Sequence, residues 1–258
     1  MKAFDYLSII AISIGLLSCD NDETTSKNPG TLELNLMHTV GADLLDLGEA
    51  YQNTSGETYV VEELKYIISN IRLTNIEGDA FIYPVDESYF VIDQAKPSTQ
   101  MIRLSNIDAG AYTQLTFGFG VDPTKYPIAS GTLNFVPTAE EADMLWTWSA
   151  GYKFIKFEGS FTSDTTPTPT PFVIHVGSHG ATLDNYKEIE LSLISDTGDP
   201  LIIEEDAPAV EGIFFDVGRV FDGPNTISIE AKTDIQVDPV NAPKIANNIQ
   251  TAFFIPRG

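Results

Sequence analysis

The chain has 258 residues, of which 43% are hydrophobic and 20% are charged, so it can bury a substantial core and is not a disordered or collagen-like polymer. Fourteen Lys and Arg are set against 37 Asp and Glu, which gives a formal net charge of -23. A field of this sign repels phosphate backbones and anionic lipid headgroups, so nucleic acid is not expected as a partner.

The N-terminus resembles a bacterial lipoprotein signal. Lys2 supplies a short basic start, residues 6–17 form an apolar run too short to remain as a membrane span, and the single cysteine, Cys19, follows Leu16-Leu17-Ser18. Asp5 is out of place in the basic region. Cleavage before Cys19 would leave it as the lipid-modified first residue. An uncleaved anchor and an ordinary secretory signal are the alternatives.

This reading divides the chain into three segments: a signal peptide at residues 1–18, an acidic tether at 19–30 and one domain at 31–258. We expect a protein of the cell envelope, periplasmic or anchored at the outer membrane or cell surface. The membrane is then reached only through the N-terminal lipid.

From Leu32 onward, short alternating apolar runs are broken by Gly, Pro, Asn and Asp. The runs lie at 32–36, 115–121, 155–161, 189–193 and 227–229. So many half-apolar strands predict an all-β fold, a β-sandwich of two sheets with long loops.

Three stretches need separate interpretation. Residues 58–73 have apolar residues at helical spacing, but they are rich in β-branched and aromatic side chains, so we predict a strand. Residues 243–252 fit a short C-terminal helix, because Ile245 and Ile249 lie one turn apart. The proline-rich run 165–171 predicts an extended loop.

No enzyme motif is present: there is no Gly-rich phosphate loop, no His-Glu-x-x-His pair, no Gly-x-Ser-x-Gly elbow and no cysteine pair for zinc. We therefore do not expect an enzyme. The acidic turns at 196–199 and 204–206 lack the ligand register of a calcium loop and are interpreted as solvated loops. A scaffold stabilised by calcium there is a third hypothesis.

The three histidines are candidate metal ligands. His38 has the parity of Leu32, Leu34 and Leu36 and is expected to face the core. His175 is expected on the face opposite Phe172, Ile174 and Val176, and His179 in the loop that follows. Each of them alone is more typical of a core or surface histidine than of a ligand.

Trp146 and Trp148 are two residues apart and would share one face of an extended segment. An aromatic core cluster is the plainest interpretation of this pair. Composition and spacing alone therefore indicate a secreted, anchored, acidic β-sandwich and no more.

Weak motifs spread over nearly the whole mature chain, taken in this order, resemble the MbnP family, copper-binding proteins named for their association with methanobactin operons. The stretches that carry the resemblance are Val40-Gly41 with Leu44 and Leu47, Tyr51 with Asn53, Gly56-Glu57, 64–73, 88–93, 109–112, 119–122, 146–154, 157–159, 175–177, 221–224 and 245–248.

The resemblance implies a β-sandwich that holds one copper ion, Cu+ or Cu2+, through histidines and a tryptophan oxidised to kynurenine. A partner dihaem protein resembling a cytochrome peroxidase performs that oxidation. Carried over by position, it makes Trp146 or Trp148 the candidate for modification, His175 the best matched ligand, His38 the second and His179 the third. Imidazole suits copper, and opening the indole ring creates an aromatic amine that can face the metal.

The chain departs from the pattern in two respects. Asn247-Asn248 runs to Gly258 without the Met-Phe pair and the His-bearing tail of relatives, and Met37, Met101 and Met144 are too scattered to form a thioether cluster for Cu+.

The expected function is extracytoplasmic copper binding, for acquisition, storage or delivery. The rival is a surface-anchored sandwich that binds glycan or protein through exposed aromatics without a metal.

Overall fold

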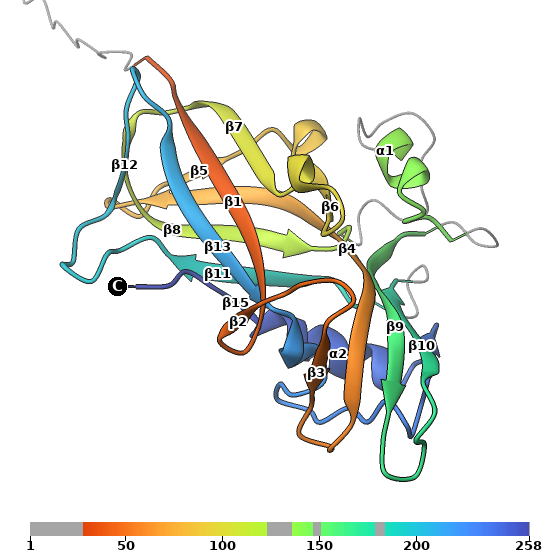
Figure 1. Cartoon of the computed structure of the whole chain (residues 1–258). Coiled ribbons are helices and arrows are strands. Elements are labelled where there is room, and N and C mark those ends of the chain that lie inside the picture. The colour runs from red at the N-terminus through yellow and green to blue at the C-terminus, as the bar shows by residue number, and fades with distance from the viewer. Residues whose placement is uncertain (1–27, 123–135, 147–150, 179–183, 258) are drawn as a thin grey trace, which may run out of the picture.

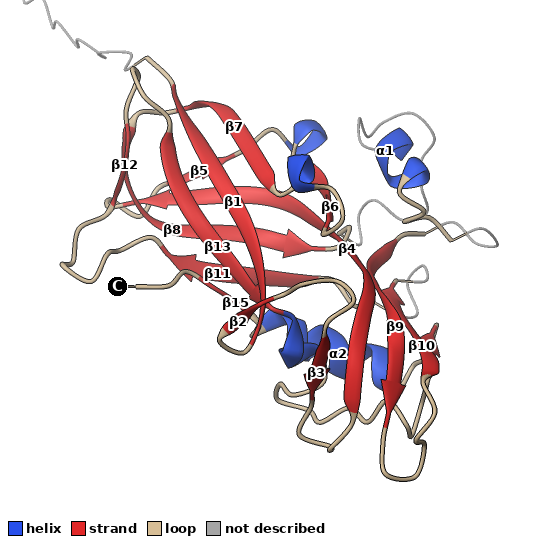
Figure 2. Ribbon diagram, viewed as in Figure 1, coloured by secondary structure: helices blue, strands red, loops and turns tan. Residues whose placement is uncertain are grey.

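The computed structural model describes residues 28–122, 136–146, 151–178 and 184–257. Within these residues the chain folds into two β-sheets packed face to face, with two α-helices (Figures 1 and 2). The all-β, two-sheet prediction is confirmed. The predicted signal peptide and Cys19 lie outside the described residues. No helix in the described part of the chain is long and apolar enough to cross a bilayer.

The smaller sheet has the order β15-β13-β1-β2, and β7 pairs with the first half of β1 on the same edge as β2. Its strands are β1 (Gly30–Val40), β2 (Asp43–Leu44), β7 (Met101–Ile107), β13 (Ala209–Asp216) and β15 (Phe253–Phe254). Strands β1 and β13 run parallel, although Leu32 and its partner Ala209 are 177 residues apart in the chain. Alternation along each strand does not reveal a pairing over such a distance.

The larger sheet has the order β11-β8-β4-β9-β10-β14, with β12 on β8 and with β3, β5 and β6 on β4. Its strands are β3 (Ala50–Gln52), β4 (Thr58–Asn75), β5 (Ala80–Ile82), β6 (Tyr89–Asp93), β8 (Gly110–Phe119), β9 (Lys153–Thr162), β10 (Thr170–Gly177), β11 (Lys187–Ser192), β12 (Leu201–Ile203) and β14 (Asp234–Gln236). The long strand β4 changes neighbour along its length. Its first half pairs with β9, and its second half pairs with β8 (Figure 1).

Strand β4 confirms that residues 58–73 form a strand. Its change of neighbour coincides with a bulge at Asn70, whose φ of 52° is a left-handed conformation that Asn adopts more readily than bulkier residues. Ile67 and Ile68 are both buried although they point to opposite faces. Both faces of this part of the sheet are therefore covered, which explains why the sequence lacks a clean alternation here.

The structure differs from the sequence-based prediction at one loop and one helix. The predicted loop 165–171 is two residues too long, because β10 begins at Thr170 and Pro171 pairs with Ser160 of β9. Strand β14 joins the other side of β10 only from Val173, so Pro171 sits at a sheet edge, where its missing N–H costs no ladder bond. The helix α1 (Val136–Glu141) was not predicted.

The C-terminal helix is confirmed as α2 (Asn241–Gln250), which buries Ile245 and Ile249 as the one-turn spacing predicts. It packs against β10, β11 and the 3-10 turn Val217–Val220, so it closes one end of the sandwich. Two further 3-10 turns lie at Val85–Glu87 and Pro97–Thr99.

The core between the sheets is a single apolar cluster with many aromatic rings. Phe215 of the smaller sheet stacks on Phe253 at 4.5 Å between ring centroids, and Tyr66 of the larger sheet lies edge-on to Phe215 at 5.3 Å. These contacts join the two layers, and the imidazole of His38 lies among them.

Candidate metal centre

The outer face of the larger sheet carries a row of polar side chains. Lys65, Lys156, His175 and Gln236 are consecutive register partners across β4, β9, β10 and β14. Register partners point to the same face, so this row faces away from the smaller sheet, whereas the neighbour Tyr66 points inward to Phe215. The predicted orientation of His175, opposite to Phe172 and Ile174, is confirmed.

His175 is held at both ring nitrogens. Its Nε2 lies 2.6 Å from Oε1 of Glu158, and its Nδ1 lies 3.1 Å from Oε1 of Gln236. The side chain is almost buried, and this burial lowers the pKa of His175 below its ordinary value of 6.5, against the opposing effect of Glu158. A pKa below 6.5 favours the neutral imidazole at pH 7, and both of its ring nitrogens already lie against acceptor oxygens.

Trp146 lies beside His175. Residues 142–146 cross the outer face of the sheet: the Lys65 ammonium donates to the Ala142 carbonyl at 3.4 Å, and Leu145 bridges to Tyr152. The indole N–H donates to the Tyr152 carbonyl at 3.2 Å. The indole is 5% exposed, and its ring centroid is 5.9 Å from that of His175.

Two glycines leave room for this indole. A Cβ at Gly177 would lie 2.2 Å from the Tyr152 carbonyl oxygen and 3.1 Å from the indole nitrogen of Trp146. A Cβ at Gly151 would lie 2.9 Å from the carbonyl oxygen of Ser178. The absence of both side chains lets the indole lie directly against the backbone.

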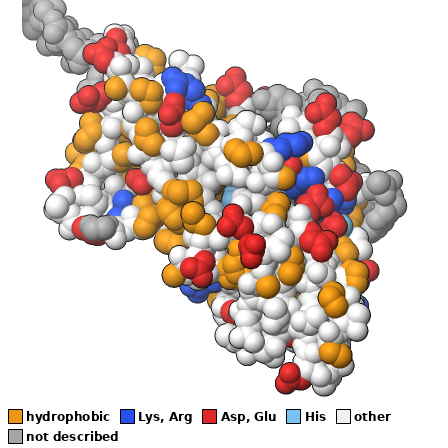
Figure 3. Space-filling model, in the orientation of Figure 1, with side chains coloured by type: hydrophobic (Ala, Val, Ile, Leu, Met, Phe, Trp, Pro, Cys, Tyr) orange, Lys and Arg blue, Asp and Glu red, His pale blue; other side chains and the backbone are white. Residues whose placement is uncertain are grey.

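A network of charges lies beside the pair, and its two lysines are buried whereas Asp143 is exposed. The Lys156 ammonium is 3.0 Å from Glu63, 3.0 Å from Asp143 and 3.6 Å from Glu158. Burial disfavours this ammonium, but its hydrogen bonds to Asp143 and Glu63 outweigh burial and raise the pKa of Lys156. Lys153 bonds Asp143 at 3.0 Å and lies 5.7 Å from the centre of the Trp146 ring. Figure 3 shows lysines and acidic side chains mixed over this part of the molecule.

His38 is inward, as predicted, but it does not belong to this cluster. It lies on β1 with 3% of its surface exposed, and its Nε2 is 2.9 Å from the Tyr66 hydroxyl. Burial lowers the pKa of His38 to about 4, with Gln94 opposing that effect. Because Tyr66 and His175 are on opposite faces of the larger sheet, that sheet separates His38 from His175.

The structure therefore brings together only part of the predicted set. His175 and Trp146 are neighbours, His38 stands apart, and His179 and Trp148 lie outside the described residues. Sequence reasoning missed Glu158, Gln236, Lys153 and Lys156. The alternation of Lys156 and Glu158 with Ile155 and Phe157 does place them on an outer face, but it does not reveal the partner.

The donor atoms of this cluster fit copper only in part. A neutral imidazole whose other nitrogen meets a carboxylate is the usual arrangement of a metal-binding histidine, so His175 fits as one ligand. Within the residues that the structure describes, no group of three or more His, Cys, Asp or Glu is arranged to hold an ion. His175 alone does not make a complete site.

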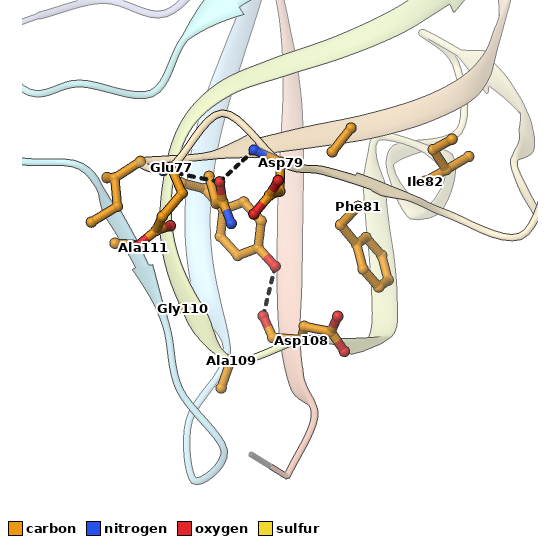
Figure 4. Close-up of a pocket in the computed structure, with 12 residues that line it drawn as sticks. Glu77, Asp79, Phe81, Ile82, Asp108, Ala109, Gly110 and Ala111 are labelled. Atoms are coloured by element: carbon orange, nitrogen blue, oxygen red, sulfur yellow. Dashed lines mark hydrogen bonds between the residues drawn. The ribbon is translucent and has the colours of Figure 1, made fainter. Parts of the chain in front are cut away.

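Two hollows open on the surface of the described residues and are candidate sites for a ligand. One, of about 500 Å³, opens beside Glu158 and is lined also by Leu47, Lys65, Asp93 and Lys96. It leads from solvent to the carboxylate that meets His175. The other, of about 390 Å³, lies far from the imidazoles between the β4–β5 and β7–β8 turns, where Tyr112 donates to the Asp108 carbonyl at 2.7 Å (Figure 4). It contains acids and no imidazole.

These observations define the class: an all-β sandwich with a His–Trp cluster on the outer face of its larger sheet. Residues 29–242 match the profile of the MbnP family, and the chain belongs to that family. Among solved structures, MbnP from Methylosinus trichosporium is similar, with a TM-score of 0.53, 10% sequence identity, and coverage of 84% of this chain and 87% of that chain. At this identity the likeness shows the fold alone. No curated protein matches the chain.

Proposed function

We propose that the chain is a lipid-anchored, extracytoplasmic copper-binding protein that acquires, stores or delivers the metal and performs no turnover chemistry. Membership of the MbnP family supports a copper-related role. The observation that carries the proposal is the contact between the neutral, nearly buried imidazole of His175 and Glu158, beside the buried indole of Trp146. His175 is the ligand that we assign, and copper, as Cu+ or Cu2+, is the metal.

Trp146 is the indole that we assign to oxidation. An intact indole offers no available lone pair, whereas kynurenine carries an aromatic amine. Trp146 lies 5.9 Å from the His175 ring, so a group derived from it would face the same metal. The partner in this proposal is a dihaem protein resembling a cytochrome peroxidase. Trp148 and His179, close in sequence, are candidates for further contributions.

The rival function requires an aromatic platform at the surface. With 5% of its surface exposed, Trp146 does not provide one. The acidic turn at 196–199 is closed by its own bonds, from the Ser195 amide to the Asp199 carbonyl at 2.8 Å and from the Thr197 hydroxyl to the Asp199 carboxylate at 2.6 Å. No contact in the described residues favours either alternative over copper.

The test is copper per chain after dialysis, measured by elemental analysis on the chain without its predicted leader, with His175→Ala and His38→Gln as variants. We expect His175→Ala to lose copper and His38→Gln to retain it. Undiminished copper in His175→Ala would remove that histidine from the site. Co-production with the dihaem partner should change the mass of the Trp146 peptide by the loss of one carbon and the gain of one oxygen.

A further inference from the structure

We propose that a third hollow, whose lining shares no residue with the His175 cluster, binds a primary ammonium group. The hollow has a volume of about 400 Å³ and lies where β1 and β13 end and β4 begins. The Tyr59 hydroxyl and the carboxylates of Asp216 and Asp222 are the acceptors that line it. Its size is that of a pocket for a small molecule.

The Tyr59 hydroxyl is the group that points to a ligand. Tyr59 is 1% exposed, yet its hydroxyl forms no hydrogen bond within the part of the chain that the structure describes, and it borders the hollow. The ring is fixed by contacts with Tyr51 and Phe221, at 6.0 and 4.9 Å between centroids. Because a buried hydroxyl without a partner costs free energy, a group that enters the hollow and meets this oxygen is stabilised there.

The two carboxylates are held in place by neutral donors. Oδ1 of Asp216 accepts from the Gly41 and Gly218 amides at 3.0 and 3.1 Å. Asp222 accepts from the Thr54 amide at 2.9 Å and from the Thr54 hydroxyl. Neither carboxylate forms an ion pair with a Lys, Arg or His among the described residues. The negative charge at the hollow is therefore oriented but not matched by a cation of the protein.

The hydroxyl and the carboxylates border one open space. A Cβ at Gly218 would lie 3.2 Å from Oδ1 of Asp216 and 3.7 Å from the Tyr59 hydroxyl oxygen, so the absence of a side chain at Gly218 keeps this space open. Burial raises the pKa of Tyr59 above its ordinary value of 10, and the charges of Asp222 and Asp216 raise it further. The hydroxyl therefore lies in a negative potential, which attracts a cation.

An ammonium matches this set of acceptors better than other groups do. It carries three N–H donors, no acceptor and a positive charge, whereas a hydroxyl group offers one donor and no charge. A metal ion is less suited, because no group of three or more His, Cys, Asp or Glu in the described ranges is arranged to hold one. Arg219 also lines the hollow, but it is exposed, so solvent screens its repulsion of an ammonium.

The first experiment titrates the metal-free chain without its predicted leader at pH 7, labelled with carbon-13 at the tyrosine Cζ atoms, with n-butylammonium. Tyr59→Phe assigns the Tyr59 signal in the NMR spectrum. We expect a saturable shift of that signal at millimolar n-butylammonium, weaker at high salt, and no shift with butan-1-ol or butyrate. No shift with n-butylammonium, or an equal shift with butan-1-ol, would overturn the proposal.

A lysine with blocked termini distinguishes two sources of the ammonium group. If it shifts the Tyr59 signal as n-butylammonium does, the lysine side chain of a partner protein can supply the group. If only n-butylammonium does so, the ligand is a free amine.

The second experiment compares two tyrosine variants by calorimetric titration with n-butylammonium and by urea unfolding. Tyr59→Phe removes a hydroxyl that has no partner in the described chain, so it should keep its stability and bind about 10-fold or more weakly. The control is Tyr51→Phe: the Tyr51 hydroxyl accepts from the Asp46 amide at 2.8 Å and does not line the hollow, so affinity should be kept. Unchanged affinity in Tyr59→Phe, or equal losses in both variants, would refute the site.

Discussion

His38 predicts an acid sensitivity that one substitution should remove. The imidazole is 3% exposed, and what it contacts is uncharged: the Tyr66 hydroxyl, the Phe215 ring and the Gln94 side chain. Burial lowers the pKa of His38 from 6.5 to about 4, so the unfolded chain takes up the proton before the folded chain does. The contribution of neutral His38 to the unfolding free energy is therefore complete above pH 6.5 and is lost as the pH falls toward 4. The pKa difference corresponds to about 3 kcal/mol.

The assay is urea unfolding between pH 7 and pH 5 for the chain without its predicted leader and for His38→Gln in the same chain. The amide of Gln keeps an acceptor for the Tyr66 hydroxyl and does not titrate in this range. By pH 5 the native chain should lose about 2 kcal/mol more of its unfolding free energy than His38→Gln. The lowered pKa values of Glu57, Glu63 and Asp143 act below this window, because their ordinary values are 4.5 or less.

The control is His175→Gln. Burial also lowers the pKa of His175, but Glu158 opposes that effect, so its removal should flatten the pH dependence less than the removal of His38. Parallel curves for the native chain and His38→Gln across pH 7 to 5 would refute the claim that a neutral His38 is enforced by burial.

Two further predictions concern close packing and a buried carboxylate. Gly177→Ala should lower the unfolding free energy by about 1–3 kcal/mol and shift tryptophan emission to longer wavelength, because its Cβ would lie 2.2 Å from the Tyr152 carbonyl. In Gly110→Ala, the control, the Cβ has nothing nearer than 3.9 Å, and unchanged behaviour of Gly177→Ala would contradict the close approach. Glu57→Gln should cost about 2–3 kcal/mol in thermal or urea unfolding, since the buried carboxylate accepts from Asn53, Ser228 and the amides of Ile229 and Glu230 at 2.6–2.9 Å. Burial raises the pKa of Glu57, but these donors outweigh it and leave the pKa below 4.5. The contribution of the Glu57 carboxylate to the unfolding free energy is thus present above pH 4.5 and lost below it. A Glu57→Gln chain as stable as the native one at pH 7 would show that the donors are satisfied without the charge.

The fold could be predicted where the determining interactions are local. Alternation along 32–36 and 155–161 identified strands and assigned the inward face correctly, because side-chain direction depends only on position within a strand. The parallel pairing of β1 with β13 could not be obtained in this way. It depends on contacts between segments far apart in the chain, which leave no period in either one.

The same distinction applies to the candidate site. Alternation along the strands predicted that His38 points into the core and that His175 lies on the face opposite Phe172, and both orientations are confirmed. The position of a residue within a strand does not tell which sheet its face packs against. The prediction therefore placed His38 and His175 in one metal site, although the larger sheet lies between them. The Glu158 contact depends on the register of β9 against β10, which sequence alone does not supply.

The motifs that carry the family resemblance separate in space into two groups with different physical roles. Asn248 is fully buried, donates to the Val220 and Asn225 carbonyls at 3.0 and 2.7 Å, and accepts from the Asn225 amide at 2.8 Å. Gly223 allows this approach, since its Cβ would lie 2.6 Å from the Asn248 side chain. This group joins α2 to the preceding loop and holds the fold together without any metal.

The second group is Trp146, Gly151, His175 and Gly177, which meet on the outer face of the larger sheet. None of these residues is needed to join the two sheets, because the contacts between the sheets are made by the aromatic core on the other face. Gly loses the most conformational freedom on folding, so the two glycines of this group lower the stability of the fold. Packing alone does not explain why they hold an indole against a histidine. The copper proposal therefore depends on this second group, whereas family membership is supported by both.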